Sequence, residues 1–288
     1  MLGRGQLSPC VARVQSMNKN LPEEIELYRD GMWRRNPDLI VEDRADVESF
    51  IESVGFCSAL TDSRRAGPSL YIAVCGRRDA HMPRNVQKDP ETSLAWSLKD
   101  EVMRAGRVYY GKLIRGRSTF IARRLVPYFS ALWGLPRRKE SQVLSEDARA
   151  VLKVLRKEWE MATPDLKQAS GLKDRQRLTR AIDELQRTMK MIPGDVLYDP
   201  VFTYIWALAE GRFPAELNAR IPRAEALREI ARAYLTAAGM TGLGELSRVT
   251  GLSRPDAGRG NHQLVDEGLA ERLEPGVYRL STPKERAD

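Results

Sequence analysis

Trp96, Lys99 and Asp100 are the residues whose types and spacing best suit chemistry. Their i, i+3 and i+4 spacing would place them on one side of a helix. The indole offers a stacking face, the lysine amine a nucleophile, and the carboxylate a group that positions a water or stabilises positive charge. The alternative is that Trp96 belongs to the core and Lys99 pairs with a neighbouring carboxylate on a solvated face. We therefore predict these three residues as a catalytic site, with the structural role as its alternative.

The scarcity of histidine and cysteine argues against several common active sites. The sequence holds two histidines, His81 and His262, which is little material for a histidine-rich metal centre or a Ser-His triad. Its three cysteines, Cys10, Cys57 and Cys75, are odd in number and lack C-x-x-C spacing, which argues against a disulfide framework and a zinc site. The sequence therefore predicts no metal, no cofactor and a reducing, cytoplasmic location.

The charge of the chain is basic and clustered. The formal net charge is +8, and residues 102–139 hold ten Lys or Arg residues and no acidic one. A solvated helix face normally mixes both signs, so this run predicts a surface for a polyanion, nucleic acid before membrane. No run approaches eighteen apolar residues, and we expect no membrane span. The alternative is that the charges only keep an aromatic core soluble. The candidate phosphate-binding residues of the run are Lys112, Arg115, Arg117, Arg123 and Arg124.

The sequence contains one pattern of residues twice. Residues 170–198 and residues 250–280 both begin with a small residue and Gly-Leu, continue through a polar, Arg-rich stretch and apolar positions at helical spacing, and reach Pro-Gly, Val and Tyr. In the last part, helices over 222–239, 242–251 and 254–268 precede two short strands around a Glu-Pro-Gly turn. Three helices and a hairpin predict a winged helix, a form of helix-turn-helix. The middle part repeats it with helices over 145–159, 163–171 and 174–189, a hairpin from 190, and a strand or helix over 199–214.

The first part of the chain is less regular. We expect a helix from about Ala45 to Ser53, a buried strand or short helix over 69–76, and a helix over 93–106. Residues 107–134 are expected to be helices interrupted by glycines. The predicted fold is mainly α with small β-hairpins, in tandem winged-helix modules. Its expected parts are a partly disordered extension over 1–39 with Met17 as an alternative start, a winged-helix-like domain over 40–140, winged-helix domains over 141–218 and 219–282, and a tail over 283–288.

The third helix of each predicted module carries long hydrogen-bond donors. In a helix-turn-helix this helix lies in the major groove of DNA, where Arg pairs with guanine and Gln with adenine. Winged helices also serve as protein-contact modules, and Asp183, Glu184, Asp266 and Glu267 place negative charge near the ends of both helices. The candidate DNA-binding residues here are Arg175, Gln176, Arg177 and Arg180 in the middle module, and Arg254, Arg259 and His262 in the last.

Four segments of the first part together carry a resemblance to a known family. They are VESFIESVGFCSAL, PSLYIAV, LAWSLKDEVM and RVYYGKLIRGRSTFIARRLVPYF. With the two modules that follow, the chain resembles the AlkZ-like winged-helix superfamily over about residues 40–282, and is most similar to an AlkZ-related branch. That superfamily contains bacterial DNA glycosylases that remove alkylated bases or unhook interstrand crosslinks. The resemblance implies the fold and a partner, double-stranded DNA.

The catalytic motif of the superfamily is where this sequence departs from it. The active glycosylases carry Gln, an aliphatic residue, then Gln or Asp on a short apolar segment of the first module. The comparable segment here is Gly55, Phe56, Cys57 and Ser58, which has no glutamine and no carboxylate. The resemblance therefore implies DNA binding more than base excision.

Three functions stay open on the sequence. The first is a DNA-binding tandem winged-helix protein that acts in damage recognition or a related DNA transaction. The second is an active DNA glycosylase that excises alkylated bases through a non-standard site at Trp96, Lys99 and Asp100. The third is a non-enzymatic transcription regulator or protein-interaction module.

Overall fold

The structure is a computed structural model that describes residues 21–281. The predicted disorder and alternative start within residues 1–20, and the tail over 283–288, lie outside the described residues. The end of the predicted extension is folded: it holds α1 (Glu23–Met32) and the 3-10 helix η1 (Pro37–Leu39). Acidic side chains in the first turn of α1 favour its start, because the N-terminal end of a helix carries partial positive charge.

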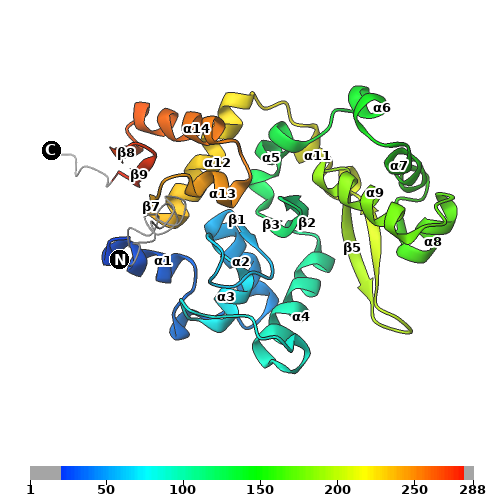
Figure 1. Cartoon of the computed structure of the whole chain (residues 1–288), viewed down its shortest axis with the longest axis horizontal. Coiled ribbons are helices and arrows are strands. Elements are labelled where there is room, and N and C mark those ends of the chain that lie inside the picture. Colours follow the sequence, from blue (N-terminus) through cyan, green and yellow to red (C-terminus); the bar gives the residue numbers. More distant parts are fainter. Residues whose placement is uncertain (1–20, 282–288) are drawn as a thin grey trace, which may run out of the picture.

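Three units of the described chain share one order of elements, namely a helix, a short strand, two helices and a two-stranded hairpin (Figure 1). In each unit the short strand pairs with the last strand, and the last strand pairs with the one before it, so the sheet order is first, third, second. The first unit contains α2 (Arg44–Val54), β1 (Phe56–Ser58), α3 (Leu70–Cys75), α4 (Pro90–Ala105), β2 (Tyr109–Ile114) and β3 (Arg117–Ile121).

The second and third units repeat this order along the chain. The second contains α7 (Glu146–Glu158), β4 (Glu160–Ala162), α8 (Thr163–Ala169), α9 (Arg175–Arg187), β5 (Met191–Leu197) and β6 (Thr203–Leu208). The third contains α12 (Arg223–Ala238), β7 (Met240–Thr241), α13 (Glu245–Thr250), α14 (Arg254–Asp266), β8 (Ala270–Glu274) and β9 (Val277–Leu280).

Short helical pieces lie within and between the units. Within the first unit, η2 (Val86–Lys88) precedes α4. The other pieces are η3 (Arg123–Leu125), α5 (Val126–Trp133), η4 (Arg137–Lys139) and α6 (Glu140–Val143) after the first unit, and α10 (Ala209–Arg212) and α11 (Pro214–Asn218) after the second. No helix in the described part combines the length and the apolar character needed to cross a bilayer.

The prediction of helices over 107–134 is wrong for its first half. Tyr109 pairs with Ile121 and Tyr110 with Phe120 in an antiparallel ladder, and the rings of Tyr110 and Phe120 lie 4.7 Å apart. Large side chains packed across the sheet stabilise a hairpin better than a helix interrupted by glycine. The turn uses the left-handed conformation, with φ of 51° at Arg115 and 71° at Gly116. Only η3 and α5, in the second half, are helical.

Two other ambiguous segments are resolved. Residues 69–76 contain the helix α3, which Gly76 ends in a left-handed conformation. Residues 199–214, predicted as one strand or helix, divide into β6, the short helix α10 and the start of α11.

The apolar core joins the first and third units. Phe56 of β1 contacts Phe129 of α5, with ring centroids 5.4 Å apart, and Tyr234 of α12, with centroids 6.1 Å apart. One continuous cluster of buried residues runs through both units and reaches Ile192, Val196 and Ala207 of the second unit. The second unit also has a smaller cluster of its own around Leu152, Leu185 and Trp206. Figure 1 shows the first unit in the middle, with the third unit and α1 on one side and the second unit on the other.

Candidate nucleic-acid interface

The helix α4 turns Lys99 and Asp100 into the protein. Asp89 caps the helix by accepting the backbone N–H of Thr92 at 2.7 Å. Lys99 and Asp100 are 1% and 3% exposed, and the Lys99 ammonium donates to the Asp100 carboxylate. The Trp96 ring is 38% exposed, and its centroid lies 4.5 Å from Lys99 Nζ. The three predicted residues therefore lie together. Lys99 pairs with a neighbouring carboxylate, as in the structural alternative, but the pair is buried and does not lie on a solvated face.

The remaining partners of this pair come from the hairpin β5–β6 of the second unit. The Tyr198 hydroxyl donates to the Asp100 carboxylate, and Lys99 Nζ lies 3.5 Å from the Tyr204 hydroxyl. Both tyrosines are about a hundred residues away in the sequence, and no pattern near Lys99 signals them. The pair joins α4 to the hairpin across the boundary between two units.

The electrostatics of this site follow from its burial. Burial lowers the pKa of Lys99, and the hydrogen bond to Asp100 partly offsets this effect. Burial, with the nearby Asp100, raises the pKa of Tyr198 and of Tyr204 to about 12. An amine with a lowered pKa is a better nucleophile at neutral pH, but this one is enclosed. In the present arrangement the pair holds the hairpin on α4.

The tip of the hairpin β5–β6 exposes large apolar side chains. Val201 is 71% exposed, Tyr198 57%, Leu197 43% and Phe202 41%. The ring of Phe202 lies edge-on to Trp96, with centroids 6.2 Å apart, so the indole continues the same surface. The hairpin extends away from α8 and α9 (Figure 1). We call residues 197–202 the apolar tip. Sequence reasoning missed it, although "LYDPVF" is an unusually apolar loop.

Half of the ten cations of the basic run are neutralised within the protein. Lys112 Nζ lies 3.2 Å from Asp183, and Arg123 and Arg124 pair with Glu216 and Glu52. Arg104 and Arg107, also in the run, pair with Asp195 and Glu48. The acidic partners come from other segments of the chain, which the run itself does not reveal. Three of the five predicted phosphate-binding residues therefore have carboxylate partners.

The turn of the hairpin β2–β3 is different. Arg115 donates to the carbonyl of Ser247 at 3.3 Å, which docks the turn on α13. Arg117 is half-buried, and its pKa is lowered by burial and by the positive charges of Arg65 and Arg115. Arg65 is exposed and has no ion-pair partner among residues 21–281. Three guanidinium groups thus repel one another, and this arginine cluster (Arg65, Arg115, Arg117) favours an anion.

On the predicted recognition helices, some of the candidate DNA-binding side chains have carboxylate partners among the described residues and others do not. On α9, Arg175, Gln176 and Arg180 surround a shallow hollow, and Arg177 pairs with Asp147 at 2.6 Å. On α14, Arg259 pairs with Asp256 at 2.9 Å, while Arg254 is exposed. The exposed His262 ring lies 5.9 Å from that of Tyr278 on β9.

The segment comparable to the catalytic motif of the AlkZ-like superfamily is a core strand. Cys57 of β1 is 2% exposed and pairs with Phe120 of β3, and burial raises the pKa of its thiol. Neither an amide nor a carboxylate stands at residues 55–58 to position a water. Among the described residues, no three His, Cys, Asp or Glu side chains are grouped as metal ligands would be.

Comparison with known proteins assigns the chain to a family. A family model described as "AlkZ related" matches residues 41–199, which is more than half of this chain. The chain belongs to the AlkZ-related family. A search of curated proteins gives no significant match.

A solved structure agrees with this family at the level of the fold. The Streptomyces sahachiroi DNA glycosylase AlkZ is similar with a TM-score of 0.53 and 15% sequence identity, over 88% of this chain and 70% of that one. The AlkZ-like fold therefore extends beyond the family match into the third unit. This mainly helical architecture with small antiparallel sheets agrees with the fold predicted from the sequence.

Proposed function

We propose that this AlkZ-related protein binds double-stranded DNA and recognises damaged or distorted sites in it. The observation that carries the proposal is the apolar tip, which joins the Trp96 face beside it. Large exposed apolar side chains on a projecting hairpin are otherwise unfavourable in water. They suit contact with unstacked bases, because aromatic and apolar side chains stack on bases or wedge between base steps.

The three units are, in this proposal, tandem winged-helix modules over residues 40–140, 141–218 and 219–282. The common order of elements supports this assignment, with α4, α9 and α14 in the place of the recognition helix. The name of the similar structure, a DNA glycosylase, supports a DNA partner. The cytoplasm stays the predicted location, in keeping with the free Cys57 and Cys75.

Phosphate contacts are assigned to cations that have no carboxylate partner. The arginine cluster fits this role, because it raises positive potential beside an exposed surface. Arg175, Arg180 and Arg254 are further candidates, since no carboxylate pairs with them among the described residues. Arg123, Arg124, Arg177 and Arg259, with Lys112, contribute less because their charges are neutralised.

The test is equilibrium binding of the full chain to a labelled duplex, intact and alkylated, over a salt series. We expect affinity to fall steeply with salt, because every phosphate neutralised by the protein releases counterions. We expect the alkylated duplex to bind more tightly. Absence of binding at low salt would contradict the proposal and favour a protein-interaction module. A preference for one base sequence regardless of damage would favour a transcription regulator.

Base excision is a second candidate, and the lowered pKa of Lys99 beside Asp100 and Trp96 is the observation that favours it. After Lys99 gives a proton to Asp100, its neutral amine would attack the sugar carbon that bears the base. The bond from that carbon to the base nitrogen breaks, and a cationic alkylated base leaves as the neutral base. This step requires movement of the hairpin β5–β6, because Lys99 is 1% exposed. The binding samples are therefore also assayed for released base. Release that is lost in Lys99→Ala and in Asp100→Asn would support excision, and binding without release would contradict it.

A further inference from the structure

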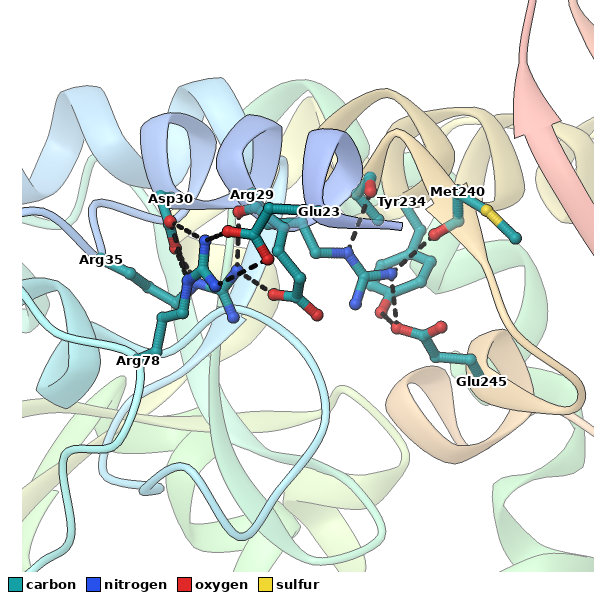
Figure 2. A network of polar contacts seen from close by, with 10 residues as sticks. Glu23, Arg29, Asp30, Arg35, Arg78, Tyr234, Met240 and Glu245 are labelled. Atoms are coloured by element: carbon teal, nitrogen blue, oxygen red, sulfur yellow. Dashed lines mark hydrogen bonds and ion pairs between the residues drawn. The ribbon is translucent and has the colours of Figure 1, made fainter. Parts of the chain in front are cut away.

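The helix α1 lies outside the family match and ties itself to the third unit through one buried arginine. Arg29 is 5% exposed. Its Nε donates to the carbonyl of Ala238 at 3.0 Å, and its Nη2 to the carbonyl of Met240 at 2.6 Å and to Glu245 Oε1 at 2.9 Å. Tyr234 donates to the same carboxylate oxygen at 2.7 Å. Figure 2 shows this arginine reaching from α1 toward α13.

Two further arginines meet at Asp30 on the same helix. Arg78 donates from Nε to Asp30 Oδ2 at 2.8 Å, and Arg35 Nε lies 3.0 Å from Asp30 Oδ1. Glu23 lies 2.9 Å from Arg78, and Glu26 lies 2.7 Å from Arg35. Figure 2 shows Arg35 and Arg78 gathered beside Asp30. The carboxylates therefore hold two guanidinium groups at fixed positions.

A pocket of about 260 Å³ lies between the end of α1, the loop over 63–68 and α13. Its lining contains a single carboxylate, that of Glu245, which Arg29 and Tyr234 already engage. Asp30, Asp62, Glu23 and Glu26 pair with lining arginines but do not line the pocket themselves. Five guanidinium groups line it. Those of Arg29, Arg35, Arg64 and Arg78 have carboxylate partners, and Arg65 alone has no ion-pair partner within the described residues, so Arg65 supplies the positive charge that is not offset.

Trp33 also lines this pocket, and its indole carries a buried donor that no described residue uses. Trp33 is 5% exposed and lies between two guanidinium groups, with ring-centroid distances of 4.6 Å to Arg29 Cζ and 5.0 Å to Arg35 Cζ. Its Nε1 has no hydrogen-bond partner within residues 21–281. An indole N–H donates and does not accept, and a buried donor without a partner costs about 1–3 kcal/mol. A phosphate oxygen that reached this donor from the pocket would remove that cost.

We propose that this arginine-lined pocket binds a phosphate group. Phosphate oxygens accept several hydrogen bonds, and the planar fork of arginine matches them in pairs. Ser63 also lines the pocket, and its hydroxyl lies 2.9 Å from His81 Nδ1. The group comes from a free phosphate or mononucleotide, or from the backbone of a nucleic acid. Arg65 belongs both to the pocket and to the arginine cluster, so the two sites are neighbours. The proposal does not require that the protein bind DNA.

The first experiment measures binding of inorganic phosphate to the full chain by calorimetry and by thermal unfolding, against chloride at equal ionic strength. A ligand that binds only the native state raises the unfolding temperature. We expect stabilisation by phosphate in the wild-type protein and at least about a fivefold loss of affinity in Arg65→Ala, from one charge-assisted hydrogen bond. This variant keeps its fold, because Arg65 is exposed and makes no ion pair in the described chain.

The matched control is Arg149→Ala, which removes an exposed arginine of α7 that has no ion-pair partner among residues 21–281. We expect it to bind phosphate as the wild type does. Phosphate that stabilises no more than chloride, or that binds equally to Arg65→Ala and the wild type, would overturn the proposal.

A second variant, Trp33→Phe, keeps an aromatic ring between the two arginines and removes the N–H. We expect its phosphate affinity to fall about fivefold while its circular dichroism stays native. Unchanged affinity would contradict the role of the indole as a donor and overturn the assigned geometry.

Competition then identifies the source of the phosphate. Displacement of bound phosphate by a nucleoside monophosphate, but not by a duplex, supports a small-molecule site. Displacement by the duplex supports a contact with the DNA backbone. Failure of phosphate binding in a protein that still binds duplex DNA overturns the pocket and leaves the proposed function intact.

Discussion

The hairpins β2–β3 and β5–β6 occupy the same place in their units, but their ends have opposite chemistry. The first ends at Arg115 and Gly116 and docks on α13, where its charges repel one another. The second ends in the apolar tip, and the pair Lys99 and Asp100 fixes it on α4 through Tyr198 of the tip and Tyr204 of β6. One topology thus supplies a charged element suited to phosphates and an apolar element suited to bases. Substitutions that remove the anchor of the second hairpin, the apolar side chains at its end, or the charge of the first hairpin distinguish the roles of the two hairpins.

The largest effect is expected from Asp100→Ala, which removes the anchor of the second hairpin. Lys99 would keep a buried charge without a carboxylate, and breaking a buried pair costs about 3–5 kcal/mol in the free energy of unfolding. Denaturant unfolding measures this loss. The control is Asp195→Ala on the same hairpin, whose partner Arg104 is half-exposed, so that about 0–1 kcal/mol is expected. Equal losses in the two variants would contradict the anchoring role.

The next effect is expected from removing the apolar tip. Val201→Ala combined with Phe202→Ala should weaken binding to a distorted duplex by about 1–3 kcal/mol for each base that stacks on these side chains. Fluorescence anisotropy with a labelled duplex measures the change. Leu27→Ala removes an apolar side chain of α1 whose exposure lies between those of Phe202 and Val201, and it should leave affinity unchanged. An equal decrease in that control would point to a general surface effect and count against stacking.

Charge at the first hairpin should have a smaller and uniform effect. Arg117→Ala should weaken binding to all duplexes alike and reduce the salt slope by about one. Its counterpart is Lys112→Ala on the same hairpin, where Asp183 already neutralises the ammonium. We expect the slope to stay as in the wild type. If Lys112→Ala lowers the slope as much as Arg117→Ala, ion pairing does not decide which cations meet the phosphates.

The smallest effect concerns alkaline pH. Tyr198 and Tyr204 have a pKa of about 12 in the folded protein, against about 10 when unfolded. Their contribution to stability is therefore complete below about pH 10 and is lost as the pH rises toward 12. Unfolding measured between pH 9 and 12 should show a shallower decline for Tyr198→Phe than for the wild type. Parallel declines would contradict burial and the hydrogen bond from Tyr198 to Asp100 as the causes of the raised pKa.

Much of the fold could be predicted because the repeated helices are strongly patterned. Leu178, Ile182 and Leu185 recur at helical spacing in α9, and all are buried. The hairpin β2–β3 could not be predicted because its strands are short and contain glycine, so that local pattern does not separate strand from helix. Pairing of β3 with β1, more than sixty residues earlier in the chain, decides the outcome.

The candidate site could be predicted only in part. The spacing of Trp96, Lys99 and Asp100 places these residues together, as one helix must. Their partners Tyr198 and Tyr204 depend on how two units pack, which no local spacing encodes. The same holds for the basic run, whose neutralising partners, such as Glu216 and Asp183, come from distant segments.

The central claim is that the apolar tip recognises distorted DNA, and one ratio tests it most directly. It is the affinity for a duplex with an abasic site divided by that for the intact duplex, at one salt concentration, for the wild type and for Phe202→Ala. We predict a ratio of about ten in the wild type, equivalent to about 1.4 kcal/mol, from one stacking interaction. In Phe202→Ala the ratio should fall close to one, with affinity for the intact duplex unchanged. A wild-type ratio of one, or a ratio that survives the substitution, would contradict the account.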